Sequence, residues 1–222
     1  MNHYSHSRAG RGFSLIELLV VMGLLVSLAA AYGFARRRSD NDGMALRSAQ
    51  AEIASLLSAG RSLAVLQQSR VRVVVHAAQP PGGEREKYLR CLQLVVEQPA
   101  GSDKWVARDE PAFLPRGVMV VPPAVVEAVV EPGIVWPAGP FAPVSALPGG
   151  SDLMLNGREI GEAYWVEYTP DGRVEPADGK LVVATAHASG SALPRFDNPA
   201  AVRGLRLYRS GAVGWINHAD DF

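Results

Sequence analysis

GFSLIELLVVM, residues 12–22, places one carboxylate, Glu17, inside an apolar run that begins directly after a glycine. From Leu15 to Ala35 no other side chain is expected to be charged at neutral pH. At roughly 1.5 Å per residue, a helix over this run would span roughly 30 Å, which is the thickness of the hydrocarbon core of a bilayer. The sequence therefore predicts a transmembrane helix over residues 13–36.

Glu17 needs an explanation because a carboxylate near the bilayer costs on the order of 2–3 kcal/mol unless it is paired. One explanation is local. Ser14 and Glu17 have the spacing of a capping box, in which the serine oxygen and the glutamate satisfy backbone donors at the start of a helix. The other explanation is a role in function or assembly, which is the usual reason for an ionisable residue within a membrane segment.

Residues 11–17, RGFSLIE, resemble the processing signal of type IV pilins and of type II secretion pseudopilins. In that family a prepilin peptidase cleaves after the glycine and methylates the new N-terminal residue. The resemblance implies a leader peptide over residues 1–12, cleavage between Gly12 and Phe13, and N-methylation of Phe13. It also implies that Glu17 acts in assembly by neutralising the terminal amine of a neighbouring subunit.

Physical reasoning independently supports cleavage before Phe13. A buried Glu17 requires a cation, and no side chain between Phe13 and Ala35 provides one. A free α-amino group at Phe13 would be charged, since its reference pKa lies near about 8, and it would lie about one helical turn from Glu17. This pair can form within one subunit or between two.

A conventional secretory signal peptide is the main alternative, with Arg8 and Arg11 as its basic region and cleavage at residues 29–31, AAA. Glu17 argues against it, because an acidic residue is out of place in the apolar region of a signal peptide, which normally has about 7–15 residues.

Arg8 and Arg11 favour a cytoplasmic N-terminus, whereas the RRR of residues 36–38 opposes it. The processing signal favours a C-terminal domain in the periplasm.

The N-terminal third contains no proline, since all 16 prolines follow position 79. This absence predicts that the helix continues over residues 37–68, with a candidate break at residues 40–43, DNDG. An apolar face suited to packing on a sheet is formed by residues with helical spacing, namely Met44, Ile53, Leu56, Leu57, Leu63 and Leu66.

Residues 69–222 have the pattern of short strands separated by turns. Strands are predicted at 71–76, 88–96, 118–121, 125–130, 152–155, 158–160, 164–169, 181–186, 205–208 and 213–216. Asn156-Gly157 is the strongest hairpin signal, and residues 205–216 are predicted to form a closing hairpin. The proline-rich segment 137–152 is predicted to be a loop that is either flexible or in contact with a partner.

The predicted fold class is therefore α+β and pilin-like. A long N-terminal helix, with one half in the membrane and one half packed, precedes an antiparallel or sandwich-like β domain. Over the whole chain this layout resembles the minor pseudopilins of the GspH/FimT type, so residues 69–222 are predicted to be a periplasmic domain of that type.

No group of residues predicts an enzyme, a cofactor or a metal site. Ser189-Gly190-Ser191 lacks the pattern of a nucleophile elbow. Cys91 is the single cysteine, so it cannot form an intrachain disulfide, and it is predicted to be a buried, unreactive thiol. Residues predicted to be structural or part of a solvated tail are His76, His187, His218, Asp220 and Asp221.

The 22 basic and 22 acidic side chains balance, and loss of Arg8 and Arg11 with the leader would leave 20 basic ones. This balance does not favour a nucleic-acid partner.

The expected protein is a minor pseudopilin of a type II secretion system, a single-pass protein of the bacterial inner membrane. Its expected partners are prepilin peptidase, other pseudopilins or pilins, membrane lipid and the secretion machinery. The alternatives are a minor pilin of a type IV pilus, including the DNA-uptake kind, a secreted binding protein and an uncleaved membrane protein.

Overall fold

The computed structural model of the chain describes residues 15–79, 84–125, 129–139, 141–151, 153–175, 177–187 and 193–222. Within the helix, the side chains of residues 17 and 29–40 are outside this description. The chain divides into two compact units, Met1–Asn41 and Asp42–Phe222, and each is described by itself.

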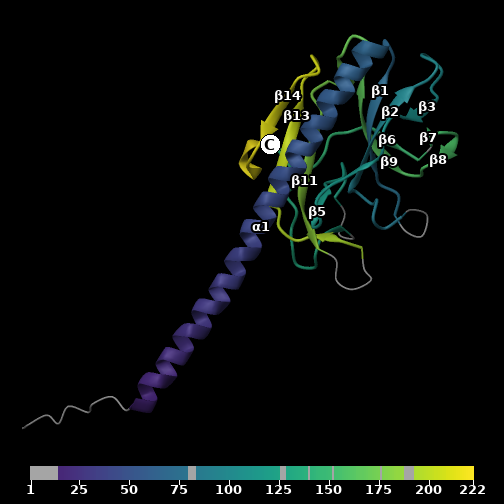
Figure 1. Ribbon diagram of the computed structural model, residues 1–222. Coiled ribbons are helices and arrows are strands. Elements are labelled where there is room, and N and C mark those ends of the chain that lie inside the picture. Colours follow the sequence, from purple (N-terminus) through teal and green to yellow (C-terminus); the bar gives the residue numbers. More distant parts are fainter. Residues whose placement is uncertain are drawn as a thin grey trace, which may run out of the picture. The chain divides into compact units, whose positions relative to one another are not determined.

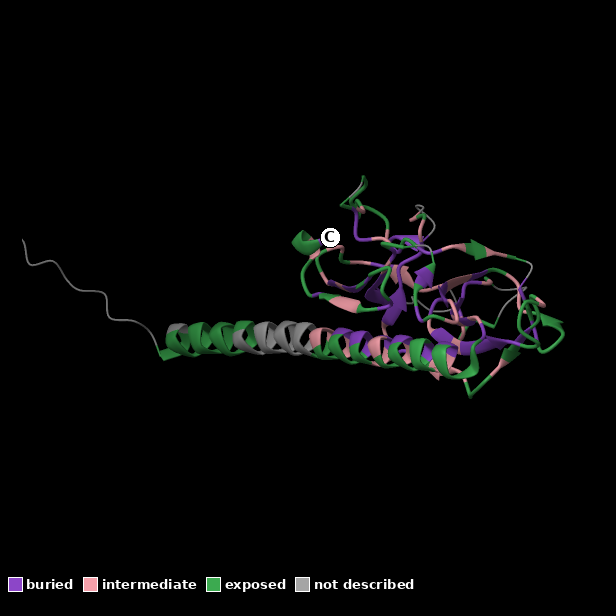
Figure 2. Cartoon of the chain, turned by 90° about the horizontal axis from the view of Figure 1, so that it is seen from above, coloured by how far each residue is buried: buried purple, intermediate pink, exposed green. Residues whose placement is uncertain are grey.

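Helix α1, Leu15–Gln67, begins in the first unit and ends in the second (Figure 1). The backbone is helical at residues 40–43, where the sequence suggested a break. In the first unit the described large apolar side chains, from Leu15 to Leu28, are all exposed (Figure 2). The part of α1 in the second unit instead buries some of its apolar side chains.

In the second unit α1 buries one stripe of side chains, at Leu46, Ala49, Ile53, Leu57 and Ala64. The predicted packing face was correct for Ile53 and Leu57 but wrong for Met44 and Leu66, which are exposed. Met44 precedes Ile53 by nine residues, and Leu66 follows Leu57 by nine. Because each residue turns the helix by about 100°, nine residues place a side chain on the opposite face.

The first sheet has the strand order β10-β9-β1-β2-β3-β7-β8, with β4 paired to β2 and β6 to β9. All of its pairs are antiparallel except β3 with β7. Its strands are β1 (Val71–His76), β2 (Cys91–Glu97), β3 (Trp105–Ala107), β4 (Ala112–Phe113), β6 (Gly149–Gly150), β7 (Met154–Leu155), β8 (Arg158–Glu159), β9 (Ala163–Tyr168) and β10 (Val174–Glu175).

The second sheet has the order β12-β11-β13-β14, with β5 paired to β11, and all of its pairs are antiparallel. Its strands are β5 (Val118–Val120), β11 (Lys180–His187), β12 (Arg195–Phe196), β13 (Val202–Leu207) and β14 (Val213–Ile216), and a short 3-10 helix, η2 (Ala219–Asp221), follows. Gln50 of α1 joins this sheet, since its Nε2 donates to the carbonyl oxygens of Gly204 at 2.7 Å and Ile216 at 3.0 Å.

One apolar core is shared by α1 and both sheets within the second unit. The helix approaches the first sheet closely at Gly60, where an added Cβ would lie 3.3 Å from Val73 Cγ2 and 3.5 Å from the ring of Tyr168. The α+β fold class, a long helix followed by antiparallel β structure, is therefore confirmed.

Several predicted strands are confirmed, and others need correction. β1 has the predicted bounds, and the hairpin of β7 and β8 turns at Asn156 and Gly157, both with positive φ. The strand predicted from residue 88 starts only at Cys91, because Lys87–Arg90 form a turn in which Leu89 has a φ of 53°. Val130 forms an isolated bridge to Phe196, and residues 126–128 of the strand predicted at 125–130 lie outside the description.

The strands predicted at 164–169 and 181–186 belong to different sheets. β9 pairs with β10 after the turn at residues 170–173, whereas β11 lies in the second sheet. The segment 137–152 joins the sheets, because Ala146 bridges to Lys180 and β6 pairs with β9. Ser145 within it is buried, and its Oγ accepts a hydrogen bond from the Val182 N–H. The loop is therefore anchored to both sheets around Ser145 and Leu147, whereas residues 137–139 and 141 are exposed.

Candidate functional site

The residues predicted to be processed are at the start of the chain. Gly12, Phe13 and Ser14 lie outside the described residues, and Glu17 is described only by its helical backbone in the first turn of α1. The capping box and the pair between Glu17 and the Phe13 amine both stay predictions. Within the part of the chain that the structure describes, no helix has the length and apolar character needed to cross a membrane.

An exposed apolar surface covers the described beginning of α1. No side chain of this surface is less than 47% exposed, the value of Val21. The members are Leu15, Ile16, Leu18, Leu19, Val20, Val21, Met22, Leu24, Leu25, Val26 and Leu28. Soluble monomers rarely expose contiguous apolar surface of this extent, so it indicates a contact with lipid or with another chain.

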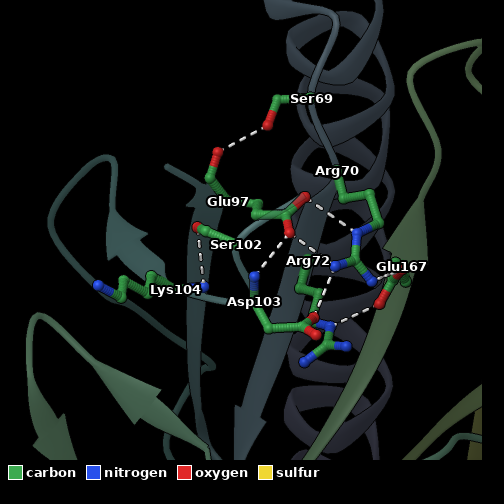
Figure 3. A network of polar contacts seen from close by, with 8 residues as sticks. All are labelled: Ser69, Arg70, Arg72, Glu97, Ser102, Asp103, Lys104 and Glu167. Carbon is green, nitrogen blue, oxygen red and sulfur yellow. Dashed lines mark hydrogen bonds and ion pairs between the residues drawn. The ribbon is translucent and has the colours of Figure 1, made fainter. Parts of the chain in front are cut away.

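A polar network in the second unit ties the end of α1 to the first sheet (Figure 3). Arg70 follows the helix and holds Glu97 of β2 through two hydrogen bonds, Nε to Oε2 at 3.0 Å and Nη2 to Oε1 at 2.6 Å. Arg70 Nη2 also lies 2.6 Å from Asp103 Oδ1, and its Nη1 lies 3.5 Å from Glu167 Oε1. Ser69 Oγ donates to the Glu97 carbonyl oxygen at 2.6 Å.

The network fixes the ionisation of its members. Hydrogen bonds from Arg70 lower the pKa of Glu97 to about 2, and burial of Glu97 opposes this shift only in part. The same hydrogen bond, together with that to Asp103, raises the pKa of Arg70. The Glu97 side chain is only 1% exposed, so its charge is supported by bidentate pairing rather than by water.

A second arginine, Arg72 of β1, lies between two indole rings. Its guanidinium carbon is 4.0 Å from the centroid of the Trp105 ring and 4.5 Å from that of Trp165. Arg72 Nε donates to Glu167 Oε2 at 2.6 Å. Contacts with two indole rings and a hydrogen bond to a carboxylate restrict the orientation of the guanidinium group. A cavity of about 390 Å³ adjoins this stack.

The other singled-out residues do not assemble a reactive site. Cys91 is buried, as predicted, and burial raises its pKa to about 11, which disfavours the thiolate form; its low reactivity stays a prediction. Burial lowers the pKa of His76, while His187 Nδ1 lies 2.7 Å from Asp197 Oδ2. In the described ranges no three His, Cys, Asp or Glu side chains are grouped as metal ligands would be. Ser189-Gly190-Ser191 lies outside those ranges.

The predicted solvated tail is only partly correct. His218, Asp220 and Asp221 are exposed, but Asp221 Oδ2 accepts a hydrogen bond from the His218 N–H at 3.2 Å. Phe222 is buried at 7% exposure and packs against the core. The segment is thus anchored by an aromatic side chain that the sequence analysis did not consider.

Residues 7–32 match the family model described as the prokaryotic N-terminal methylation motif. The match includes Gly12, Phe13 and Glu17, and it confirms the prediction of a prepilin-type motif at the start of the chain. It leaves the GspH/FimT subtype open, because it ends well before the β domain.

The chain also has a distant likeness to a solved structure, that of the type IV minor pilin FimU of Pseudomonas aeruginosa. The similarity has a TM-score of 0.38 and 13% sequence identity, and covers 82% of this chain and 91% of that chain. Curated protein sequences give no match to the chain.

Proposed function

We propose that this chain is a minor pseudopilin, a non-enzymatic structural subunit of a type II secretion pseudopilus. The N-terminal methylation motif at residues 7–32 carries the proposal. The exposed apolar surface of α1 supports it, because a surface of this kind needs a cover that the described subunit does not supply. A β domain with its own core would then contact neighbouring subunits or cargo.

In this proposal prepilin peptidase cleaves between Gly12 and Phe13 and methylates Phe13. Before assembly, residues 13–36 anchor the chain in the inner membrane with the GspH/FimT-like domain, residues 69–222, in the periplasm. During assembly Glu17 pairs with the charged amine of Phe13 on a neighbouring subunit. Removal of one partner would leave the other charge, Glu17 or the amine, unpaired in an apolar environment, which costs on the order of several kcal/mol.

Replacement of Gly12 by valine tests processing. We expect Gly12→Val to block cleavage, because a branched side chain would stand at the scissile bond. Intact-mass measurement of the protein from its native envelope should give a chain that starts at N-methylated Phe13 in the wild type and retains residues 1–12 in the variant. A wild-type start beyond Ala31 would instead identify a secreted protein, and a retained Met1 an uncleaved anchor.

Replacement of Glu17 by alanine tests assembly separately from insertion. Loss of the charge eases burial in lipid, so membrane insertion of Glu17→Ala should be unchanged while its incorporation into filaments falls about tenfold or more. Membrane fractionation and quantification of the subunit in sheared filaments would measure the two steps. Normal incorporation of the variant would reject the pairing role.

A minor pilin of a type IV pilus is the second candidate, because the methylation motif is shared by both kinds of subunit. Deletion of the secretion ATPase or of the pilus ATPase in the host would distinguish them. We expect only loss of the secretion ATPase to prevent incorporation of this subunit into filaments.

A further inference from the structure

The cavity beside the Arg72 stack is lined by residues of both the stack and β6 to β7, namely Arg72, Trp105, Trp165, Gly149, Gly150, Leu153 and Met154. Asp103 stands at its margin with a side chain that is 76% exposed. The volume of about 390 Å³ lies in the range of about 300–1,000 Å³ that is typical of ligand pockets. It can therefore hold a few residues of an extended chain but not a folded element.

Arg72 has unused hydrogen-bond donors at this cavity. Within the described part of the chain Arg72 makes one side-chain hydrogen bond, from Nε to Glu167, which is drawn in Figure 3. Neither Nη atom is buried or bonded to a described residue. Because the two tryptophan rings restrict the orientation of the guanidinium group, these donors can bind a ligand with little further loss of side-chain entropy.

The charges around the cavity disfavour an anionic ligand. Arg70 and Arg72 are surrounded by Glu97, Asp103 and Glu167, so the network has an excess of one negative charge. The Nη donors of Arg72 are therefore best matched by an uncharged acceptor. A peptide carbonyl oxygen meets this requirement, and the N–H of the same backbone can donate to the exposed carboxylate of Asp103.

The β6 part of the lining also presents peptide groups. β6 consists of Gly149 and Gly150, which pair with Tyr164 and Ala163 of β9 on one edge. Within the described residues β6 has no strand on its other edge. The Tyr164 ring packs against Gly149, whereas an added Cβ at Gly150 would meet only the Trp165 ring, at 3.5 Å. An extended chain can therefore approach the backbone of β6 at Gly150. Met154, 45% exposed, adds an apolar contact beside them.

We propose that the cavity between Arg72, Trp165 and β6 binds an extended, uncharged peptide segment of a neighbouring filament subunit. The identity of the partner rests on the proposed function. One carbonyl oxygen of the segment accepts from the Nη atoms of Arg72, and an apolar side chain packs on Met154 and the edge of Trp165.

Photo-crosslinking in the native envelope tests the proposal with the full chain. p-Benzoylphenylalanine replaces Met154 in one variant and Phe113 in a matched control, because Phe113 is 42% exposed in the same sheet but does not line the cavity. We expect position 154 to crosslink to a protein with the same N-terminal motif, identified by mass spectrometry, in a yield about fivefold or more above the control. Equal yields, or crosslinks only to lipid or to proteins without the motif, would overturn the proposal.

A pair of substitutions at Gly150 provides an independent test. An added Cβ there would meet only the Trp165 ring, at 3.5 Å, so the fold tolerates it. Gly150→Gln supplies a competing amide oxygen to Arg72 and should lower the crosslink at position 154 about fivefold, the effect of one ordinary hydrogen bond. Gly150→Ala should leave the yield within about twofold. An unchanged yield in Gly150→Gln would contradict the binding mode.

The same samples separate this proposal from the proposed function. A mature chain that starts at Phe13 but gives no specific crosslink at position 154 rejects only the peptide site. A chain that starts elsewhere rejects the pseudopilin itself.

Discussion

The two parts of α1 are both rich in large apolar side chains, yet the surroundings of these side chains differ. In the first unit Leu24 is 59% exposed, whereas in the second unit Leu57 is fully buried against the sheets. The second part has buried positions separated by polar ones, whereas residues 18–35 of the first part contain no charged side chain. A helix of the second kind needs one partner surface, whereas a helix of the first kind needs to be surrounded.

This difference teaches that apolar content alone does not predict what covers a helix. The subunit itself covers the stripe that contains Ile53 and Leu57, because that stripe repeats at helical spacing beside the β domain. For the surface from Leu15 to Leu28 the proposed function supplies lipid before assembly and other helices after it. Three changes can break or sharpen the comparison.

The largest expected effect is the difference in the free energy of unfolding between substituting a leucine in each part of α1. Leu57→Ala should lower the free energy of unfolding by about 3 kcal/mol, because it leaves a cavity in the core. Leu24→Ala should change it by less than about 0.5 kcal/mol. Chemical denaturation of the full chain in detergent can be followed by tryptophan fluorescence, since all four tryptophans lie in the second unit. Similar losses in both variants would refute the assignment of the two environments.

The next effect concerns pH, since a polar network also stabilises the second unit. The pKa of Glu97 falls from an ordinary 4.5 to about 2 in the folded chain. A lowered folded-state pKa gives stability that is present above pH 4.5 and is lost as the pH falls toward 2, here on the order of 2 kcal/mol because Arg70 is partly exposed. Denaturation at a series of pH values would measure it. Arg70→Met should be less stable at pH 7 and show a weaker dependence on pH in that interval; an identical profile would exclude the pair as the cause.

The smallest effect compares two helical glycines, one in each unit. An added Cβ would meet no atom within 4 Å at either Gly23 or Gly43. Gly43→Ala should stabilise the second unit by about 0.5–1 kcal/mol, because alanine favours the helix. Gly23→Ala should leave the fluorescence-monitored unfolding unchanged. A gain for Gly23→Ala would mean that the first part of α1 unfolds together with the β domain.

Sequence patterns were sufficient for the features that depend on neighbouring residues. Proline-free helix, alternating strands and the Asn156-Gly157 turn are local signals, and each corresponds to an element of the structure. The short strands β3, β4, β6, β10 and β12 were missed, because two or three residues show no periodicity. The division of the strands between two sheets was not predicted either, since it depends on contacts between distant segments such as β5 and β11.

The candidate site shows the same limit. The processing motif is contiguous, so the sequence revealed Gly12, Phe13 and Glu17 as a group. Arg72 and Glu167 were not singled out, although each is a charged residue inside an otherwise apolar or aromatic strand. That interruption is a usable signal, but their partners Trp105 and Trp165 come from strands separated by about sixty residues, and only the fold brings them together.

Gln50 fixes the register of α1 against the second sheet. Its Nε2 donates hydrogen bonds to the carbonyl oxygens of Gly204 and Ile216, on adjacent strands, and its Oε1 accepts one from Arg203 Nη1. A slip of the helix by one residue would rotate Gln50 away by about 100° and leave these groups unsatisfied in the interior. These hydrogen bonds therefore oppose sliding of α1 along its axis relative to the second sheet.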